Sequence, residues 1–203
     1  MRAILPEQIA NELKDNIHSI GQNYDDVTIL FSDIVDFTKT SSGYTAAEIV
    51  HALNELFSLF DIRAQNSGVE KIKTIGDAYM AACGLPTPNK DHAKVMVAFA
   101  KGMLDDLEEY NKTAKIKFNI RIGINCGPAA AGVIGRTKFI YDVWGNTVNV
   151  ASRMESASRK GKIRVSETVY KHLTEANVTD IEFSKPIECD IKGKGLMTTY
   201  EIL

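Results

Sequence analysis

The sequence predicts an α+β domain in which helices cover one face of a mixed sheet. Strand-like and helix-like segments alternate along the chain without the regular strand–helix rhythm of a doubly wound parallel sheet. The 203 residues are 44% hydrophobic and 25% charged, which is ordinary for a globular protein. A chain of this length buries roughly 70% of its unfolded surface. We therefore expect one large domain, or at most two small ones, with a sizeable core.

Charge, hydropathy and cysteine content exclude several classes of protein. The chain has 24 basic and 26 acidic side chains and a net charge of −2, so no surface for nucleic acid is expected. No apolar run approaches the roughly 18 residues of a membrane span, and no signal peptide opens the chain. Cys83, Cys126 and Cys189 lie far apart, which excludes a disulfide framework. We expect a soluble domain of a reducing compartment, the cytoplasm.

Residues 1–25 are expected to form a segment of their own. Residues 5–14 have a proline near their start and place Ile9 and Leu13 four apart, which predicts a short amphipathic helix. Residues 15–26 are polar and contain a glycine, as a connector does. The helix either packs on its own domain or ends an upstream coiled-coil or sensor segment, and the sequence leaves both possibilities open.

The domain proper, residues 26–203, begins with a β-prone run. Residues 27–34 are typical of a central strand. Thr45 and Glu48 form a capping-box signature, after which apolar residues follow at helical spacing. The remaining pattern predicts strands at 69–75, 78–83, 117–125, 129–134 and 163–165, a hairpin-like segment at 139–143, and helices at 91–110 and 147–158.

Asp33 and Asp77 each stand where a β-prone run ends. Carboxylates at adjacent strand ends can hold two divalent ions roughly 3.5–4 Å apart, an arrangement used for in-line phosphoryl displacement. Mg²⁺ suits such a site because it keeps few protein ligands. The alternative is purely structural: Asp77 is a turn residue after Gly76, and Asp33 caps the next helix. Spacing alone favours this alternative.

Two further patterns suit phosphate chemistry. Residues 34–38 form a turn between strand and helix, where backbone N–H groups can bind phosphate, and the absence of a Walker-type motif excludes a P-loop. In a helix, Asn149 and Arg153 would project from one face about 5–6 Å apart. An amide beside a guanidinium suits the charge that develops on a phosphoryl group in transit, although the same residues would also serve as a polar surface.

Five segments, in this order, resemble the catalytic domain of class III nucleotide cyclases. They are FSDIVDFT (31–38), KIKTIGDAYM (71–80), RIGINCGP (121–128), YDVWGNTVNVASR (141–153) and IKGKG (191–195). The resemblance covers about Asp26 to Leu203. It implies a ferredoxin-like palm with a mostly antiparallel sheet, and a wreath-like homodimer whose active sites lie between two subunits.

The resemblance also implies roles for individual residues. Asp33 and Asp77, with the carbonyl of Ile34, match the ligands of two Mg²⁺ or Mn²⁺ ions. The other matching positions concern the nucleotide: Phe37 and Thr38 cradle phosphate, Arg121 and Lys192 hold the triphosphate, Asn149 orients the ribose, Arg153 stabilises the transferring phosphate, and Lys73 and Asp142 read the base. Both halves of the site are present in one chain, so a homodimer would have two complete sites.

The two base-reading positions predict ATP as substrate, and therefore an adenylate cyclase that makes 3′,5′-cyclic AMP and pyrophosphate. Lys73 can only donate, which suits adenine N1, and ionised Asp142 can only accept, which suits the N6 amine. Guanine has the opposite polarity. The surrounding sequence nevertheless resembles eukaryotic guanylate cyclases, above all those coupled to rhodopsin in fungi. Relative to those enzymes, Lys73 would replace a glutamate and Asp142 a cysteine, either naturally or by engineering. GTP therefore stays the alternative substrate.

The resemblance further implies a cytosolic domain that follows a sensor or coiled-coil segment in a membrane-attached protein. Nucleic acid is not expected as a partner. The histidines show no metal-ligand spacing, so we expect them to be ordinary surface residues; they are His18, His51, His92 and His172.

Overall fold

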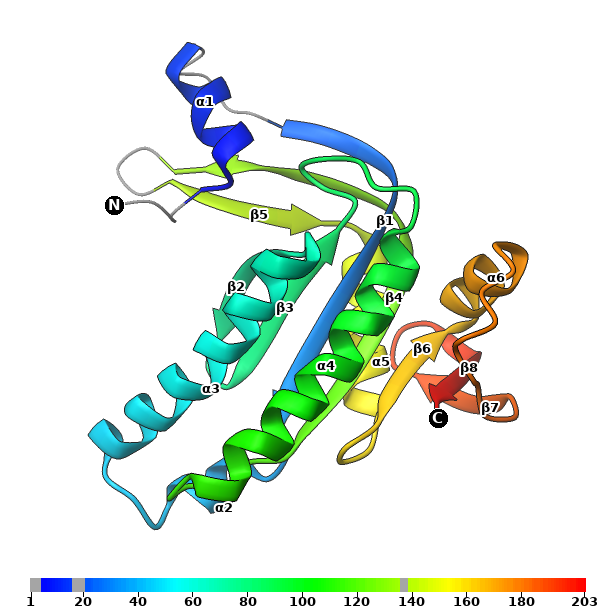
Figure 1. Ribbon diagram of the computed structural model, residues 1–203. Helices are drawn as coiled ribbons and strands as arrows, with labels where there is room; N and C mark the ends of the chain where they lie inside the picture. The colour runs from blue at the N-terminus through cyan, green and yellow to red at the C-terminus, as the bar shows by residue number, and fades with distance from the viewer. Residues whose placement is uncertain (1–4, 16–20, 136–138) are drawn as a thin grey trace.

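The computed structural model describes residues 5–15, 21–135 and 139–203, and the domain is built around one sheet (Figure 1). Within these ranges its eight strands are β1 (Gly21–Ile34), β2 (Glu70–Ile75), β3 (Ala78–Cys83), β4 (Ile120–Ile134), β5 (Ile140–Trp144), β6 (Ile163–Ser166), β7 (Ile187–Ile191) and β8 (Gly195–Ile202). The helices are α1 (Glu7–Asp15), α2 (Phe37–Ser41), α3 (Ala46–Ser67), α4 (His92–Thr113), α5 (Asn146–Ala157) and α6 (Glu167–Glu175).

The sheet is mixed and mostly antiparallel, which confirms the predicted fold class. Its strand order is β2-β3-β1-β4-β6-β8-β7, and β5 pairs with β4 beside that path. The β4–β6 pair is parallel and the other pairs are antiparallel. The predicted capping box is also confirmed, because Thr45 and Glu48 exchange backbone-to-side-chain hydrogen bonds at the start of α3. Within the described ranges, no helix combines the length and the apolar character needed to cross a bilayer.

The two central strands are longer than predicted. β1 already begins at Gly21, in the expected connector, because residues 21–24 pair with residues 129–132 of β4. β4 is one strand through Pro128, where two were predicted. Between Tyr24 and Val27 the register shifts and gives β1 one extra residue opposite this proline, a bulge that accommodates a residue without an N–H. Residues 16–20 of the expected connector lie outside the described residues.

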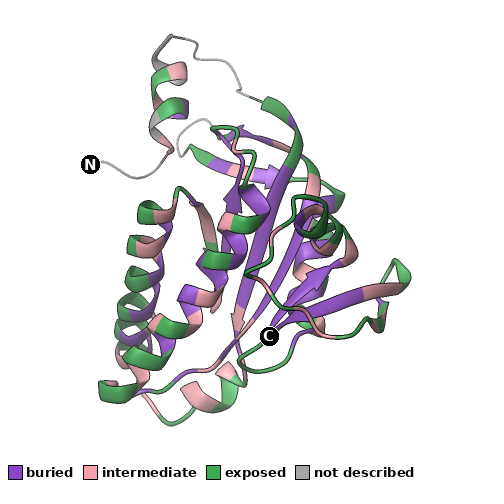
Figure 2. Cartoon of the chain, turned by 45° about the vertical axis from the view of Figure 1, so that its right-hand side comes forward, coloured by how far each residue is buried: buried purple, intermediate pink, exposed green. Residues whose placement is uncertain are grey.

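Both faces of the sheet are covered, which corrects the expectation of helices on one face. Leu30 lies in the core beneath α3, α4 and α6, whereas Ile29 and Phe31 belong to a second cluster with Ala151 of α5 and Ile9 of α1. Figure 1 shows α4 in front of the sheet and α5 behind it, and Figure 2 shows the central strands largely buried. A nearly continuous apolar strand requires cover on both sides. Since Ile9 is only 1% exposed, α1 packs on this domain; an upstream origin of residues 1–25 stays a prediction.

The packing of α5 on β4 leaves no room for a side chain at Gly123. A Cβ there would overlap the backbone nitrogen and Cα of Glu155. We expect Gly123→Ala to displace α5 and lower the free energy of unfolding by at least the ~1–3 kcal/mol typical of overpacked cores. Urea denaturation measures this loss. Gly43→Ala is the matched control, because a Cβ there meets nothing within 4 Å; equal losses in both variants would contradict the packing argument.

Candidate active site

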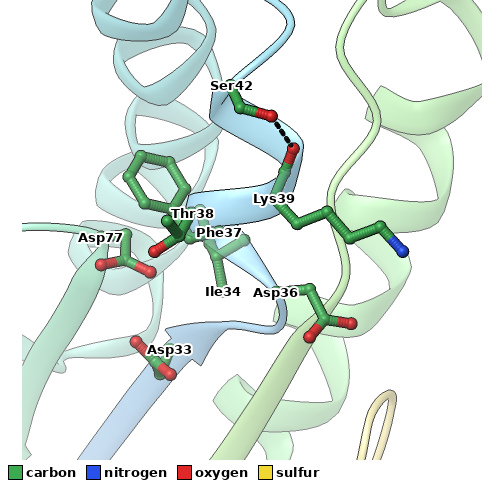
Figure 3. Close-up of a pocket in the computed structure, with 8 residues that line it drawn as sticks. All are labelled: Asp33, Ile34, Asp36, Phe37, Thr38, Lys39, Ser42 and Asp77. Carbon is green, nitrogen blue, oxygen red and sulfur yellow. Dashed lines mark hydrogen bonds between the residues drawn. The ribbon is translucent and has the colours of Figure 1, made fainter.

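Asp33 and Asp77 come together at one end of the central strands, although spacing along the sequence alone favoured separate structural roles for them. Asp33 is the penultimate residue of β1, and Asp77 lies in the turn between β2 and β3. Because β1 and β3 are antiparallel with Tyr79 opposite Ser32, this turn lies next to the end of β1. Gly76, with a φ of 63°, provides the left-handed conformation of the turn. Figure 3 shows both carboxyl groups beside the helix α2.

A single guanidinium group connects these carboxylates to α5. Arg121 of β4 is the cross-strand partner of Asp33, and its Nη2 lies 2.8 Å from Asp33 Oδ2. The Nε of Arg121 lies 2.6 Å from Glu155 Oε1. Glu155 is only 8% exposed and is a site residue that the sequence motifs did not reveal. The available signal was its spacing, four residues after Ala151, which places it on the buried face of the helix.

The electrostatics of this cluster favour a bound cation. Burial raises the pKa of Asp77, and the neighbouring charge of Asp33 raises it further. Burial also raises the pKa of Glu155, while the ion pair with Arg121 opposes that shift. Three partly or fully buried carboxylates thus face one guanidinium. Such an all-oxygen donor set fits a hard divalent ion such as Mg²⁺.

An open pocket of about 720 Å³ lies over the two aspartates. Besides them its lining consists of Ile34, Asp36, Phe37, Thr38, Lys39 and Ser42, from the end of β1 and from α2 (Figure 3). Asp36 precedes α2 in the left-handed conformation, with a φ of 57°, and so turns the chain sharply out of the sheet. The predicted phosphate-cradling residues therefore lie at the same pocket as the predicted metal ligands.

Lys73 and Asp142 form an ion pair, although 68 residues separate them in the sequence. Lys73 lies on β2 and Asp142 on β5. The Asp142 side chain is 15% exposed, and its Oδ1 accepts a hydrogen bond from the Val143 N–H at 2.8 Å. The structure thus brings the two predicted base-reading residues into direct contact.

The remaining predicted residues lie apart from both groups. Asn149 and Arg153 are exposed on α5, and Lys192 is exposed after β7. The β7–β8 turn lies beside the start of α5, because Lys194 donates a hydrogen bond to Asn146. Within the described part of the chain, no hydrogen bond or ion pair joins the side chains of Asn149, Arg153 or Lys192 to Asp33 or Asp77.

One expectation about the histidines is wrong. His92 is buried, with 3% exposure, and its Nδ1 lies 2.6 Å from Thr28 Oγ1. His172 of α6 lies against it, with ring centroids 4.6 Å apart. The two residues come from different helices, so their contact could not be read from spacing along the sequence.

Residues 20–203 match the adenylate and guanylate cyclase catalytic domain family, and the chain belongs to this family. An adenylate cyclase of Mycobacterium tuberculosis is 38% identical over 201 residues, which cover 98% of this chain but only 44% of that protein. The chain therefore spans less than half of that relative. The family defines the fold as that of a class III cyclase catalytic domain.

Two solved structures share both fold and sequence with the chain. The guanylate cyclase domain of RhGC from Catenaria anguillulae, in complex with GTP, is 38% identical with a TM-score of 0.81, over 90% of this chain and 98% of that one. The catalytic core of a rhodopsin-guanylyl cyclase with converted specificity, in complex with ATPαS, is 41% identical with a TM-score of 0.80, over 90% and 97%. At these identities the chain differs from both at more than half of the aligned positions, so it is not a two-residue variant of either.

The raised pKa of Asp77 gives a stability prediction. Because the folded state holds this proton more tightly than the unfolded state, ionised Asp77 lowers stability at neutral pH. We expect Asp77→Asn to raise the melting temperature at pH 7 in metal-free buffer. The difference should shrink as the pH falls through the carboxyl range, where the parent becomes protonated.

Thermal denaturation at several pH values measures this difference. Asp25→Asn, at an exposed position of β1, is the control and should leave the melting temperature nearly unchanged. A lower melting temperature for Asp77→Asn at pH 7 would contradict the charge argument.

Proposed function

We propose that this domain is an adenylate cyclase that converts ATP to 3′,5′-cyclic AMP and pyrophosphate. The observation that carries the choice of ATP is the contact between Lys73 and Asp142. This pair presents one group that only donates hydrogen bonds and one that only accepts them.

The polarity of the pair matches adenine. The Lys73 ammonium suits the N1 acceptor, and the Asp142 carboxylate suits the N6 amine. Guanine would place its N1–H against the ammonium and its O6 against the carboxylate, and each mismatch would leave buried polar groups unpaired. In the structure the two side chains pair with one another, which holds both in place for exchange with the base.

Asp33 and Asp77, with the carbonyl of Ile34, are the residues that would hold two Mg²⁺ or Mn²⁺ ions. When bound, these ions would lower the pKa of the ribose 3′-hydroxyl and balance the charge of the triphosphate. Arg121 adds a fixed positive charge beside Asp33. Glu155 acts as a positioning residue, because its contact at 2.6 Å holds the guanidinium on the side of α5.

The distribution of the residues supports a homodimer with composite sites. Asn149 and Arg153 are exposed, and their side chains have no hydrogen bond or ion pair within the described part of the chain. A second copy could bring this face of α5 to the pocket over Asp33. The amide would then orient the ribose, and the guanidinium would stabilise the charge on the α-phosphate during attack by the 3′-oxygen. Lys192 would bind the triphosphate.

GTP is the second candidate substrate. A guanylate cyclase soluble subunit beta-2 of Rattus norvegicus is 39% identical to this chain, as similar as the mycobacterial adenylate cyclase. Overall similarity therefore does not choose between the two bases.

We also propose that the domain works in the cytosol, where ATP is abundant, as part of a longer signalling protein with an upstream sensor or coiled-coil segment. Cys83 and Cys126 are free and buried, as expected in a reducing compartment.

Exchange of the base-reading residues should change the substrate preference. Lys73→Glu alone should give a poor and unselective enzyme. Each base would then make one matched and one mismatched contact with the two base-reading residues. Lys73→Glu with Asp142→Cys should move the preference to GTP by roughly a hundredfold, since each mismatched buried hydrogen bond costs about 1–3 kcal/mol. The measurement is kcat/KM for both nucleotides.

Lys71→Glu is the matched control, with the same change on the same strand. Lys71 pairs with Asp61 and is as exposed as Lys73, at 34% against 35%. Its substitution should leave the ratio of ATP to GTP activity unchanged. A parent that prefers GTP would overturn the assignment, and a double variant that still prefers ATP would show that other residues read the base.

Composite sites predict that two inactive variants restore activity when mixed. A dimer of an Asp33→Ala chain with an Arg153→Ala chain holds one site with both parent residues. With random pairing, half of the dimers are mixed, so we expect about a quarter of the parent activity.

The control mixes Arg153→Ala with Asn149→Ala chains, whose changes lie on the same half of the site. No mixed dimer then has an intact site, and the sample should stay inactive. An inactive Asp33→Ala and Arg153→Ala mixture, in which mass spectrometry detects mixed dimers, would refute the composite site.

A further inference from the structure

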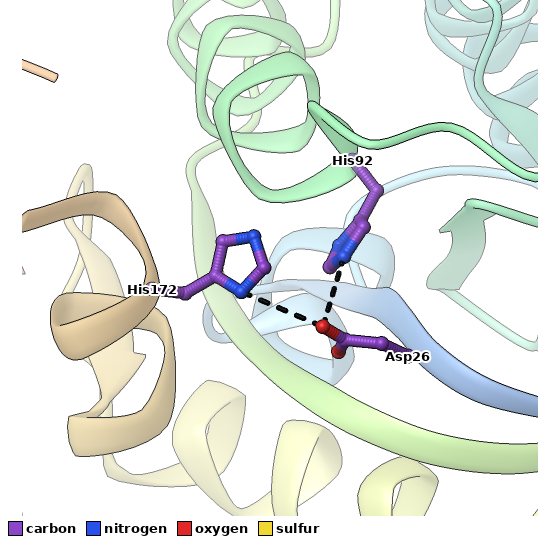
Figure 4. Close-up of side chains that lie close together, drawn as sticks. All are labelled: Asp26, His92 and His172. Carbon is purple, nitrogen blue, oxygen red and sulfur yellow. Dashed lines mark ion pairs between the residues drawn. The ribbon is translucent and has the colours of Figure 1, made fainter. Parts of the chain in front are cut away.

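Three side chains outside the candidate active site converge where β1, α4 and α6 meet. Figure 4 shows Asp26, His92 and His172 directed toward one another. The Oδ2 of Asp26 lies 3.4 Å from His92 Nε2 and 3.5 Å from His172 Nδ1. All three ligand atoms lie within 4.8 Å of one another. We propose that these residues form a binding site for a divalent transition-metal ion such as Zn²⁺, separate from the carboxylates at Asp33 and Asp77.

The spacing of the donor atoms fits a tetrahedral ion. Nitrogen and oxygen ligands lie about 2.0–2.1 Å from Zn²⁺, so two ligands at a tetrahedral angle are about 3.3 Å apart. The two distances to Asp26 are within about 0.2 Å of that edge. The third edge, between the imidazoles, can close by rotation of His172, whose side chain is 29% exposed and therefore free to adjust.

His92 already has the orientation that a metal ligand needs. Its Nδ1 lies 2.6 Å from Thr28 Oγ1, and Thr28 is fully buried in β1. A proton on Nδ1 that is donated to this hydroxyl leaves the lone pair on Nε2, the atom that faces Asp26. Such a second hydrogen bond from a ligating histidine is a regular feature of metal sites, because it fixes the ring and its tautomer.

The surroundings of His92 favour its neutral form, which is the form that binds metals. Burial lowers its pKa, an effect that Asp26 and Asp91 oppose and His172 reinforces. His92 is also the first residue of α4, where the helix dipole disfavours a positive charge. Water and ions can still reach the site through Asp26, whose side chain is 48% exposed.

The donor types select the class of ion. Two imidazole nitrogens and one carboxylate suit Zn²⁺, Co²⁺ or Ni²⁺, whereas Mg²⁺ prefers oxygen ligands alone. Three protein ligands leave a fourth position for water. A bound ion would join the bulge of β1 to α4 and α6, so its binding should stabilise the fold. The competing explanation is an Asp–His–His hydrogen-bonded cluster that binds no ion.

Cobalt titration separates these explanations. The purified chain is titrated with Co²⁺ in excess Mg²⁺, which occupies the all-oxygen carboxylates, and the visible d–d absorption of tetrahedral Co²⁺ is recorded. The variants are His172→Ala and Asp26→Asn, both at positions whose side chains are partly exposed. His51→Ala is the control, because His51 is exposed on α3 and its ion-pair partner is Glu55 of the same helix. We expect one equivalent of tetrahedral Co²⁺ in the parent and the control, and its loss in both variants.

Thermal denaturation with and without Zn²⁺ gives an independent measurement. A ligand that binds only the folded state raises the melting temperature by mass action. We expect a rise of several degrees at saturating Zn²⁺ in the parent and in His51→Ala, and none in His172→Ala or Asp26→Asn. The same Co²⁺ spectrum and Zn²⁺ shift in the parent and in both variants would overturn the proposal, as would no tetrahedral Co²⁺ in the parent.

Discussion

The antiparallel register of β1 and β4 is the constraint on which the candidate site depends. It pairs Asp33 with Arg121, and the β1–β3 register sets the turn with Asp77 beside them. A slip by one residue would turn Asp33 to the opposite face of the sheet and bury a charge among apolar side chains. The bulge between Tyr24 and Val27 separates two well-paired stretches, so β4 can pass through Pro128 without a change of register at its functional end.

This register brings together more carboxylates than one guanidinium can neutralise. Asp33, Asp77 and Glu155 share the single guanidinium of Arg121, and both Asp77 and Glu155 have raised pKa values because they are partly removed from water. A fold optimised for stability alone would replace such a cluster with apolar residues. The arrangement is reasonable where a cation and a triphosphate bring the compensating charges, so the raised pKa values of the cluster and the proposed function have one electrostatic origin.

Local signals in the sequence predicted a large part of this structure. The strand ends singled out Asp33 and Asp77 as candidates, the family resemblance favoured a shared site for them, and the capping box located the start of α3. The features that the sequence did not predict depend on contacts between residues far apart in the chain. The continuity of β4 depends on its pairing with β1, and the buried role of Glu155 depends on a partner on another element. The nearly continuous apolar run at 27–31 indicates a strand covered on both faces, although helices were expected on one face only. The contact of His92 with His172 had no such signal, because helix packing alone brings them together.

The two cation sites proposed for this domain lie on one strand, one at the bulge of β1 and the other near its C-terminal end. Asp26 and Asp33 are seven residues apart on β1, which at about 3.3 Å per residue is roughly 23 Å. The site at Asp33 offers only oxygen ligands, whereas the site at Asp26 also offers two imidazoles. Ligand type, rather than affinity alone, would therefore direct hard ions to the first site and borderline ions to the second. β1 is hydrogen-bonded on both sides, to β3 and to β4, over residues 28–32. Because these ladders fix the register of residues 28–32 on both sides, we expect an ion at Asp26 to stabilise the packing of α4 and α6 without displacing Asp33.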